Sequence, residues 1–327
     1  MAPLPVLDLF SGAGGLSQGL VGAGFEIVGA VETSADACST FRARHPQAKV
    51  YEQDLATVEL RSMRGHVAVV AGGPPCQPFS VGGKRLAGED PRNGLPQFVR
   101  AVAEVRPDAF LMENVAGLGA RRAYFEAVLA ELAGLGYHVS WQVLEAARFG
   151  VPQLRRRLFV VGTRRLGFSF PEGSATAVPA GRVLNPAHPL GPPNAAVVTY
   201  ARNPSLRPDP YHGHLWNGGG RPIDLARPSP TLLASMGGNK TPWLDTLGLV
   251  PAYHAHLARG GAPRQGCVPG ARRLTVQEAA LLQGFPASCS FAGPRSSQYR
   301  QVGNAVPPPL ARAVGSALRA HLEHRSR

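Results

Sequence analysis

The stretch PVLDLFSGAGGLSQGL, residues 5–20, decides the fold of this chain. A short apolar run leads into a glycine-rich turn, and a helical stretch follows. Glycine lets the backbone approach a ligand closely, and the first turn of a helix offers unpaired N–H groups. The next apolar run ends at Glu32, 20 residues after Gly12, where an acidic side chain binds the ribose hydroxyls of a nucleotide. The pattern predicts a nucleotide-type site. A tight turn without a ligand is the alternative, because Ser17 stands where GxGxxG has its last glycine.

Strand-like and helix-like segments alternate through residues 1–165. VAVVA, residues 67–71, is apolar and largely β-branched, which is typical of a parallel strand covered on both faces. Further strands are expected at 25–31, 109–113 and 158–162, and helices at 35–44, 95–105 and 120–135. The alternation predicts an α/β fold with a Rossmann-like, mostly parallel sheet and helices on both of its faces.

The composition is that of a soluble globular protein of 327 residues, 44% hydrophobic and 17% charged. The sequence has no apolar run of about 18 residues, which argues against a membrane-spanning helix. Its N-terminus lacks the features of a secretion signal. Four cysteines without a CxxC pair indicate reduced thiols in a cytoplasm.

The positive charge is concentrated in the second half of the chain. Residues 1–150 carry a net charge of −2, residues 151–273 carry +11 and residues 274–327 carry +4, out of a total of +13. The basic half indicates a surface for a polyanion, above all nucleic acid. A GC-rich genome, which raises arginine content, is the alternative, but it does not explain why residues 151–273 hold only 4 acidic side chains. Pro and Gly recur through 168–272, which predicts a separate loop-rich module with short strands.

Cys76 stands in GGPPCQPFS, residues 72–80, directly after the VAVVA strand. Open α/β sheets bind ligands at the carboxyl ends of their parallel strands. The flanking prolines restrict φ and hold the thiol in one place, and a thiolate is a strong nucleophile. We therefore predict a nucleophilic cysteine. A buried structural cysteine is the alternative, against which the prolines argue.

Two further motifs bring charged side chains to strand ends. Glu113 lies near the end of the strand AFLMENV, at the same sheet edge as Cys76, where burial would favour its protonated form and make it a proton donor. A surface or helix-capping glutamate is the alternative.

In QLRRR, residues 153–157, an extended chain places Gln153, Arg155 and Arg157 on one face. Arg157 leads into a buried strand, where it would be costly unless it met an anion or a polar ligand; a basic edge that contacts phosphate non-specifically is the alternative.

In this order, the motifs resemble those of the C5-cytosine DNA methyltransferases, and the resemblance extends over nearly the whole chain. The matching segments are DLFSGAGGL, Glu32, Asp54, GGPPCQPFS, ENV, QLRRR, RRLTVQEAALLQGFP at 272–286 and QVGNAVPP at 301–308. PPCQPFS together with ENV and QxRxR is highly specific for the family. The resemblance implies S-adenosylmethionine as the cofactor. It places the cofactor against Phe10, Gly12, Gly14, Gly15, Glu32, Asp54, Leu55, Leu95, Asn304 and Val306.

The resemblance also implies a reaction. Cys76 would add to C6 of cytosine and make C5 nucleophilic enough to take up a methyl group. Glu113 would hold N3 and the exocyclic amine, and Arg157, with Arg155 nearby, would contact O2 or orient the site. The cytosine must be flipped out of the duplex to reach these groups. Residues 81–93, VGGKRLAGEDPRN, are expected to close over it as a lid; an ordinary surface loop is the alternative.

The resemblance divides the chain into two domains. The catalytic domain is expected at residues 1–185, completed by residues 287–327, and the target-recognition domain at residues 186–286. Arg221 is the expected base contact, since arginine forms two hydrogen bonds with guanine; a phosphate contact is the alternative. No metal is expected, because the histidine pairs at 212/214 and 254/256 lack partners in a metal-binding pattern. The other residues expected at the DNA are Lys84, Arg85, Thr231 and Arg272.

The sequence thus predicts a sequence-specific DNA cytosine-C5 methyltransferase. It is expected to act on double-stranded DNA as a monomer in a bacterial cytoplasm, associated with the nucleoid through DNA, as the modification half of a restriction–modification system with a separate restriction endonuclease. A catalytically silent DNA-binding relative is disfavoured because Cys76, Glu113 and the arginines are all present. An RNA (tRNA) cytosine-C5 methyltransferase is disfavoured because the basic module lacks that branch's Cys-Phe-Thr signature. A nicotinamide oxidoreductase would leave PPCQ, ENV and QxRxR unexplained.

Overall fold

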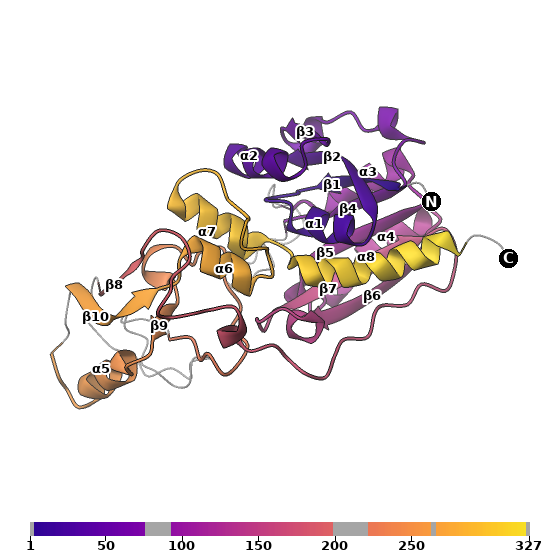
Figure 1. The fold of residues 1–327 in the computed structure, drawn as a ribbon. Helices are drawn as coiled ribbons and strands as arrows, with labels where there is room; N and C mark the ends of the chain where they lie inside the picture. Colours follow the sequence, from indigo (N-terminus) through magenta and orange to yellow (C-terminus); the bar gives the residue numbers. More distant parts are fainter. Residues whose placement is uncertain (1–2, 76–92, 199–221, 263–265, 325–327) are drawn as a thin grey trace. The chain divides into compact units, whose positions relative to one another are not determined.

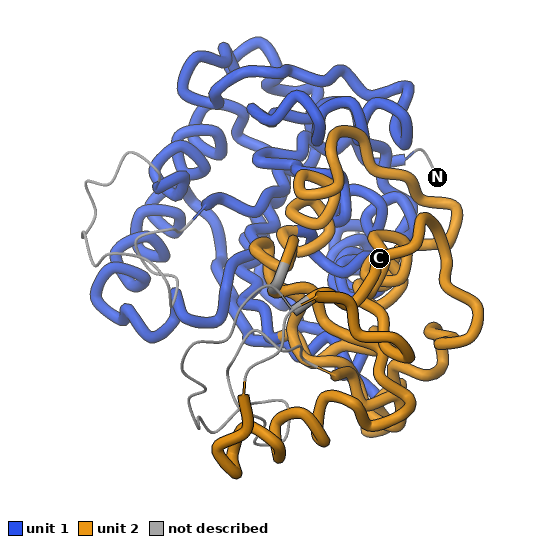
Figure 2. The backbone as a smooth tube through the Cα atoms, turned by 90° about the vertical axis from the view of Figure 1, so that its left-hand side faces the viewer, with its two compact units in different colours: residues 1–149, 156–174, 305–327 blue, residues 150–155, 175–304 orange. Residues whose placement is uncertain are grey.

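A computed structural model describes residues 3–75, 93–198, 222–262 and 266–324 of the chain (Figure 1). The chain forms two compact units (Figure 2). Unit 1 comprises residues 1–149, 156–174 and 305–327, and unit 2 comprises residues 150–155 and 175–304. The polypeptide therefore enters unit 2 briefly, returns to unit 1 for one strand, and comes back to unit 1 for its final helix.

Within the described ranges, unit 1 is built on a seven-stranded sheet in the order β3-β2-β1-β4-β5-β7-β6. The first five strands in this order pair in parallel, and β7 runs antiparallel to both β5 and β6. This confirms the expected α/β fold with a mostly parallel sheet. The strands are β1 Leu4–Leu9, β2 Phe25–Glu32, β3 Lys49–Glu52, β4 Val69–Gly72, β5 Ala109–Val115, β6 His138–Glu145 and β7 Arg156–Thr163.

Helices cover both faces of this sheet (Figure 1). α1 and α8 lie together on one face, and α3 and α4 lie on the other. α8 approaches α1 closely because Gly19 has no side chain: a Cβ there would lie 2.4 Å from the Cβ of Ala311. The last helix is thereby fixed to the first one after the glycine-rich turn. The helices of unit 1 are α1 Gly15–Gly22, α2 Ala35–Arg44, α3 Leu95–Val105, α4 Arg122–Gly134 and α8 Pro308–Glu323.

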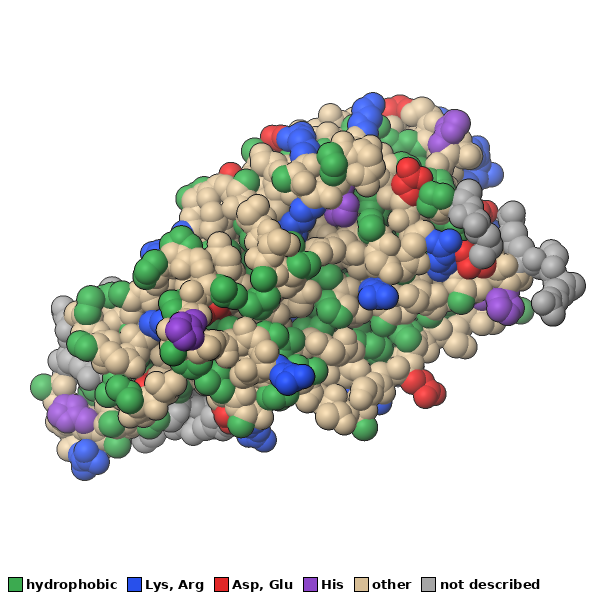
Figure 3. Space-filling view, viewed as in Figure 1, with side chains coloured by type: hydrophobic (Ala, Val, Ile, Leu, Met, Phe, Trp, Pro, Cys, Tyr) green, Lys and Arg blue, Asp and Glu red, His purple; other side chains and the backbone are tan. Residues whose placement is uncertain are grey.

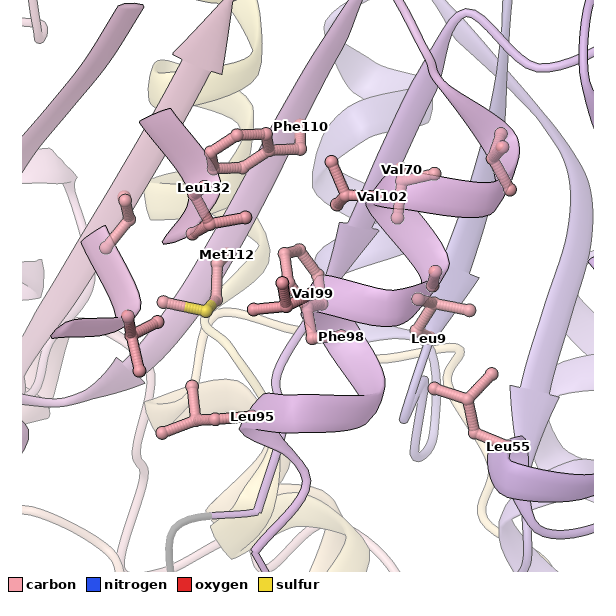
Figure 4. Close-up of a cluster of buried hydrophobic side chains, with 14 of the residues drawn as sticks. Leu9, Leu55, Val70, Leu95, Phe98, Val99, Val102, Phe110, Met112 and Leu132 are labelled. Atoms are coloured by element: carbon pink, nitrogen blue, oxygen red, sulfur yellow. The ribbon is translucent and has the colours of Figure 1, made fainter. Parts of the chain in front are cut away.

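The main core lies between α3, α4 and the sheet (Figure 4). The ring of Phe98 from α3 packs edge-on against Phe110 of β5, with centroids 6.1 Å apart. Each large apolar side chain buried here contributes about 1.5–3 kcal/mol by leaving water. This packing fixes the strands whose carboxyl ends carry the candidate site. Figure 4 labels Leu9, Leu55, Val70, Leu95, Phe98, Val99, Val102, Phe110, Met112 and Leu132.

Unit 2 is loop-rich, as its Pro and Gly content predicts. Its described sheet has the antiparallel order β8-β10-β9 and encloses a small core around Trp243. α6 begins with a capping box in which Thr275 and Glu278 exchange side-chain and backbone hydrogen bonds. The elements are β8 Ala195–Val198, β9 Trp243–Asp245, α5 Leu249–Ala258, β10 Gly266–Arg273, α6 Val276–Leu282 and α7 Arg295–Asn304. None of the helices in the described ranges has the length and apolar character needed to cross a bilayer.

Candidate functional site

The turn after β1 adopts backbone conformations that favour glycine. Phe10, Gly12 and Gly14 have φ angles of +54°, +52° and +79°. A Cβ at Gly14 would meet the Phe41 ring of α2 at 3.0 Å, so packing requires this glycine. A Cβ at Gly12 would meet none of the described atoms within 4 Å. The loop is therefore packed on α2 at Gly14, whereas no described side chain or backbone atom packs against the Cβ position of Gly12.

Glu32, at the end of β2, holds this loop in place. Its Oε2 accepts the N–H of Gly12 at 2.9 Å, and its Oε1 accepts the N–H groups of Thr33 and Ser34, each at 2.9 Å. A carboxylate that accepts several backbone N–H groups is held in one orientation. The structure thus brings Glu32 and Gly12 together, the two residues whose spacing indicated a nucleotide-type site.

The packed side of the loop rests on the end of α2. The Arg44 guanidinium donates to the Ala13 carbonyl at 2.9 Å, and His45 lies against Phe41 with ring centroids 4.7 Å apart. Burial, with a smaller contribution from Arg44, lowers the pKa of His45 to about 4. His45 is therefore neutral at physiological pH and acts as a packing residue. Sequence reasoning did not assign a role to this end of α2.

Asp8 is a second residue near the loop that sequence reasoning missed. It is completely buried in β1, and its Oδ2 accepts a hydrogen bond from the Ser17 hydroxyl of α1 at 2.5 Å. Burial, and to a lesser extent the charge of Glu32, raises the pKa of Asp8 to about 7, against the hydrogen bond from Ser17. The available signal was an acidic residue inside an otherwise apolar run.

The apolar residues expected near the cofactor support the loop from the core. The ring of Phe10 reaches the start of α3, where a Cβ on Gly94 would lie 2.9 Å from it. The next residue, Leu95, is fully buried in the main core, and so is Leu55. These side chains fix the strand ends and the first turn of α3.

The remaining expected cofactor residues are Asp54, Asn304 and Val306. Asp54 caps the short 3-10 helix Leu55–Thr57, and its Oδ1 accepts the N–H of Ala56 at 2.8 Å. Val306 is buried in unit 1. Asn304 is exposed and ends α7 in unit 2.

Glu113 and Arg157 form a largely buried ion pair, with Arg157 Nε 2.9 Å from Glu113 Oε1. β5 and β7 are antiparallel neighbours, and their register brings the end of β5 opposite the start of β7. Burial lowers the pKa of Arg157, and the charge and hydrogen bond of Glu113 oppose this effect. The anion that a buried Arg157 was predicted to need is therefore Glu113, which is itself a candidate catalytic residue.

The segment leading to Cys76 lies beside this pair. The Asn114 side-chain amide donates to the Pro74 carbonyl at 3.0 Å, and a Cβ on Gly73 would lie 3.3 Å from Glu113 Oε2. The ENV motif and the start of GGPPC thus meet at the carboxyl ends of β4 and β5. Cys76 itself, Lys84, Arg85 and Arg221 lie outside the described residues, as does most of the expected lid at 81–93.

Three other expected site residues make defined contacts within unit 2. Arg155 is completely buried, and its guanidinium donates to two backbone carbonyls. The Thr231 hydroxyl donates to the Leu154 carbonyl at 2.5 Å. Arg272 forms two hydrogen bonds of 2.7 Å with the buried carboxylate of Glu278. Arg155 and Arg272 therefore have structural roles that residue type alone did not reveal.

Basic side chains are dispersed over one face of the molecule. On the face drawn in Figure 3, Lys and Arg side chains stand singly among uncharged ones and form no continuous patch. On this face, the basic composition alone does not mark a surface for a polyanion.

The sheet order, the glycine-rich turn after β1 and the acidic residue at the end of β2 define the class of the protein. It has a Rossmann-like methyltransferase fold, a class that generally uses S-adenosylmethionine. The family model of C-5 cytosine-specific DNA methylases matches residues 4–182 and 249–320. The chain belongs to this family and is a DNA cytosine-C5 methyltransferase, as the motifs predicted.

Named relatives are bacterial Type II methyltransferases. M.AplI of Arthrospira platensis is 38% identical over 336 residues, which cover 98% of this chain and 87% of the relative. M1.HphI of Haemophilus parahaemolyticus is 38% identical, with 96% and 86% covered. Among solved structures, the Dnmt2 methyltransferase of S. pombe superimposes with a TM-score of 0.72 at 19% identity, covering 98% of this chain and 99% of the other. This last likeness shows the shared fold.

Proposed function

We propose that this methyltransferase acts on a flipped-out cytosine in double-stranded DNA, with Cys76 as the nucleophile and Glu113 as the group that holds the base. The observation that carries the proposal is the Glu113–Arg157 ion pair near the carboxyl end of β5, next to the segment that leads to Cys76. Arg157 holds the carboxylate of Glu113 in one orientation, in which Glu113 can hold the base. Pairing it with a cation also offsets part of the cost of burying it.

The proposed chemistry makes C5 of cytosine nucleophilic. The Cys76 sulfur forms a bond to C6, and the electron pair of the C5–C6 double bond becomes available at C5. Glu113 supplies a proton or a hydrogen bond to N3, where negative charge builds up, and accepts a hydrogen bond from the exocyclic amine. When bound, S-adenosylmethionine supplies the electrophilic methyl group that C5 takes up, and the electron pair of the broken S–CH3 bond stays on sulfur, which leaves S-adenosylhomocysteine. Loss of the C5 proton to a base, by default a water molecule, re-forms the double bond, and the bond between sulfur and C6 breaks.

The residues of unit 1 fit the proposed cofactor. None of the described atoms lies within 4 Å of the Cβ position of Gly12, and Glu32 lies beside Gly12 at the strand end, where a ribose would bind. Leu55 and Leu95 belong to the main core, against which Phe10 of the loop packs. The proposed contacts are Phe10, Gly12, Gly14, Gly15, Glu32, Asp54, Leu55, Leu95, Asn304 and Val306.

We further propose that residues 186–286 recognise the target sequence, and that residues 1–185 and 287–327 form the catalytic domain. Thr231, Lys84, Arg85 and Arg221 are the proposed DNA contacts. Arg272 is a further proposed DNA contact, and the carboxylate of Glu278 holds its guanidinium in one orientation. Since the named relatives are Type II methyltransferases, the proposed setting is a restriction–modification system in a bacterial cytoplasm, with a separate endonuclease.

The test is transfer of a tritiated methyl group to mixed-sequence duplex DNA, with tRNA as the competing substrate. Bisulfite-type sequencing of DNA from an expressing host would give the modified base and its sequence context. Cys76→Ala should abolish transfer and retain duplex binding, and Cys267→Ala, an exposed cysteine in unit 2, is the matched control. DNA with 5-fluorocytosine at the site should trap the wild-type protein covalently. Residual methylation by Cys76→Ala would exclude this cysteine as the nucleophile.

A further inference from the structure

Residues 153–155 form a clamp on residues 229–232 within unit 2. Gln153 is 0% exposed, Leu154 49% and Arg155 1%, so alternate side chains point inward, as an extended chain requires. The Gln153 side-chain oxygen accepts the N–H of Leu232 at 3.0 Å, and Arg155 donates to the carbonyl of the same residue at 3.0 Å. Both backbone groups of Leu232 are therefore held by buried side chains of one segment.

The segment between these two side chains adds contacts of its own. The N–H of Leu154 donates to the Ser229 carbonyl at 2.8 Å, and the Leu154 carbonyl accepts the Thr231 hydroxyl at 2.5 Å. Thr231, one of the proposed DNA contacts, is thus attached directly to the clamp. A displacement of Thr231 has to move or break this set of hydrogen bonds.

Arg155 connects the clamp to the end of α7. While one of its terminal nitrogens holds Leu232, the other donates to the Gly303 carbonyl at 2.8 Å. The backbones also touch directly: a Cβ on Gly303 would lie 2.4 Å from the carbonyl oxygen of Leu233. Asn304, a proposed cofactor contact, is the next residue. One buried guanidinium therefore joins the segment at Thr231 to the segment at Asn304.

We propose that Arg155 is a positioning residue that couples DNA binding at Thr231 to cofactor binding at Asn304. Hydrogen bonds from a charged group are among the stronger ones in proteins, and the loss of an acceptor for a buried guanidinium strongly destabilises the folded protein. The shared guanidinium therefore links the positions of the two segments. A ligand that orders either segment lowers the cost of ordering the other, and this effect is reciprocal. The inference rests on the proposed placement of DNA and cofactor.

The experiment measures binding in place of turnover. S-adenosylhomocysteine is titrated by calorimetry into the full-length protein, with and without a duplex that the wild-type protein methylates. The ratio of the two Kd values is the coupling factor, which we expect to lie between about 5 and 150 for the wild type. Arg155→Lys, which keeps the charge and loses the planar two-point geometry, should reduce the factor to about 2 or less. Arg259→Lys, at an exposed position of unit 2, is the matched control.

A second variant and a second measurement cover the case in which Arg155→Lys does not fold. Gly303→Ala inserts a methyl group against the Leu233 backbone and should also reduce the coupling factor. In the unmodified protein, S-adenosylhomocysteine alone should slow hydrogen exchange at the Leu232 amide. A wild-type coupling factor near 1, an unchanged factor in both folded variants, or unaltered exchange at Leu232 would overturn the inference. None of these results would affect the proposed function, which is tested separately by methylation of duplex DNA.

Discussion

Asp8 offers a direct test of how tightly β1 and α1 enclose the start of the glycine loop. Its carboxyl group is completely buried, and its pKa of about 7 lies well above the ordinary aspartate value of 3.8. The folded protein therefore holds this proton to a higher pH than the unfolded chain does. The contribution of Asp8 to stability is full below about pH 4 and is lost as the pH rises to about 7.

The perturbation is Asp8→Asn, which keeps the shape of the side chain and removes its titration. Because each pKa unit corresponds to about 1.4 kcal/mol, the two pKa values predict that wild-type stability falls by roughly 3 kcal/mol between pH 5 and pH 8 through this group alone. All other titrating groups are shared, so their effects cancel in the difference between the two proteins. The variant should therefore gain roughly 3 kcal/mol relative to the wild type over this range.

The assay is urea unfolding of both proteins at pH 5 and at pH 8, with the slopes compared to verify that the unfolding transitions expose equal surface. Asp108→Asn, which removes an exposed carboxylate at the start of β5, is the matched control. A stability difference between Asp8→Asn and wild type that is the same at both pH values, within about 0.5 kcal/mol, would refute the reasoning. Asp8 would then not be sealed from water by Ser17 and the surrounding core.

Four further substitutions test the loop and the ion pair. Glu113→Ala leaves Arg157 buried without its carboxylate and should destabilise the fold by about 3–5 kcal/mol in urea unfolding, with loss of methylation. Gly14→Ala and Gly12→Ala should both lower the melting temperature, because both residues have a positive φ, and Gly14→Ala should lower it more, because its Cβ would also meet Phe41 of α2. Gly12→Ala should in addition raise the KM for S-adenosylmethionine. His45, with a pKa of about 4, is neutral in the fold, so stability should fall as the pH drops from 6.5 toward 4; His45→Gln should reduce this loss, measured by thermal melting at pH 7 and pH 5.

The sequence was sufficient to predict those elements for which local and tertiary signals agree. The helices expected at 35–44 and 95–105 are found with the same bounds, and each has a local start signal: the Ser34 side chain caps α2, and Pro96 stands in the first turn of α3. The meeting of ENV with GGPP also followed from a general rule, since parallel strands place their carboxyl ends at one edge. Fold and strand-end motifs could therefore be predicted without coordinates.

The outer strands were missed for a physical reason. β3 and β6 are the outermost strands of the sheet, and their side chains are mostly partly or fully exposed, including Trp141. Such strands lack the continuous apolar run that identified β4 and β7. They are strands because they form hydrogen bonds with a neighbouring strand, and the sequence pattern does not identify that neighbour.

The arginines of QLRRR show where residue type stops being informative. Gln153, Arg155 and Arg157 alternate as an extended chain requires, but the boundary between the compact units falls after residue 155. Arg157 meets a carboxylate in unit 1, whereas Arg155 meets carbonyls 77 and 148 residues away in unit 2. Sequence alone gives the cost of burying a guanidinium; its acceptor depends on tertiary packing. Identical residues two positions apart therefore make different contacts: Arg157 pairs with a carboxylate, and Arg155 joins two backbone segments.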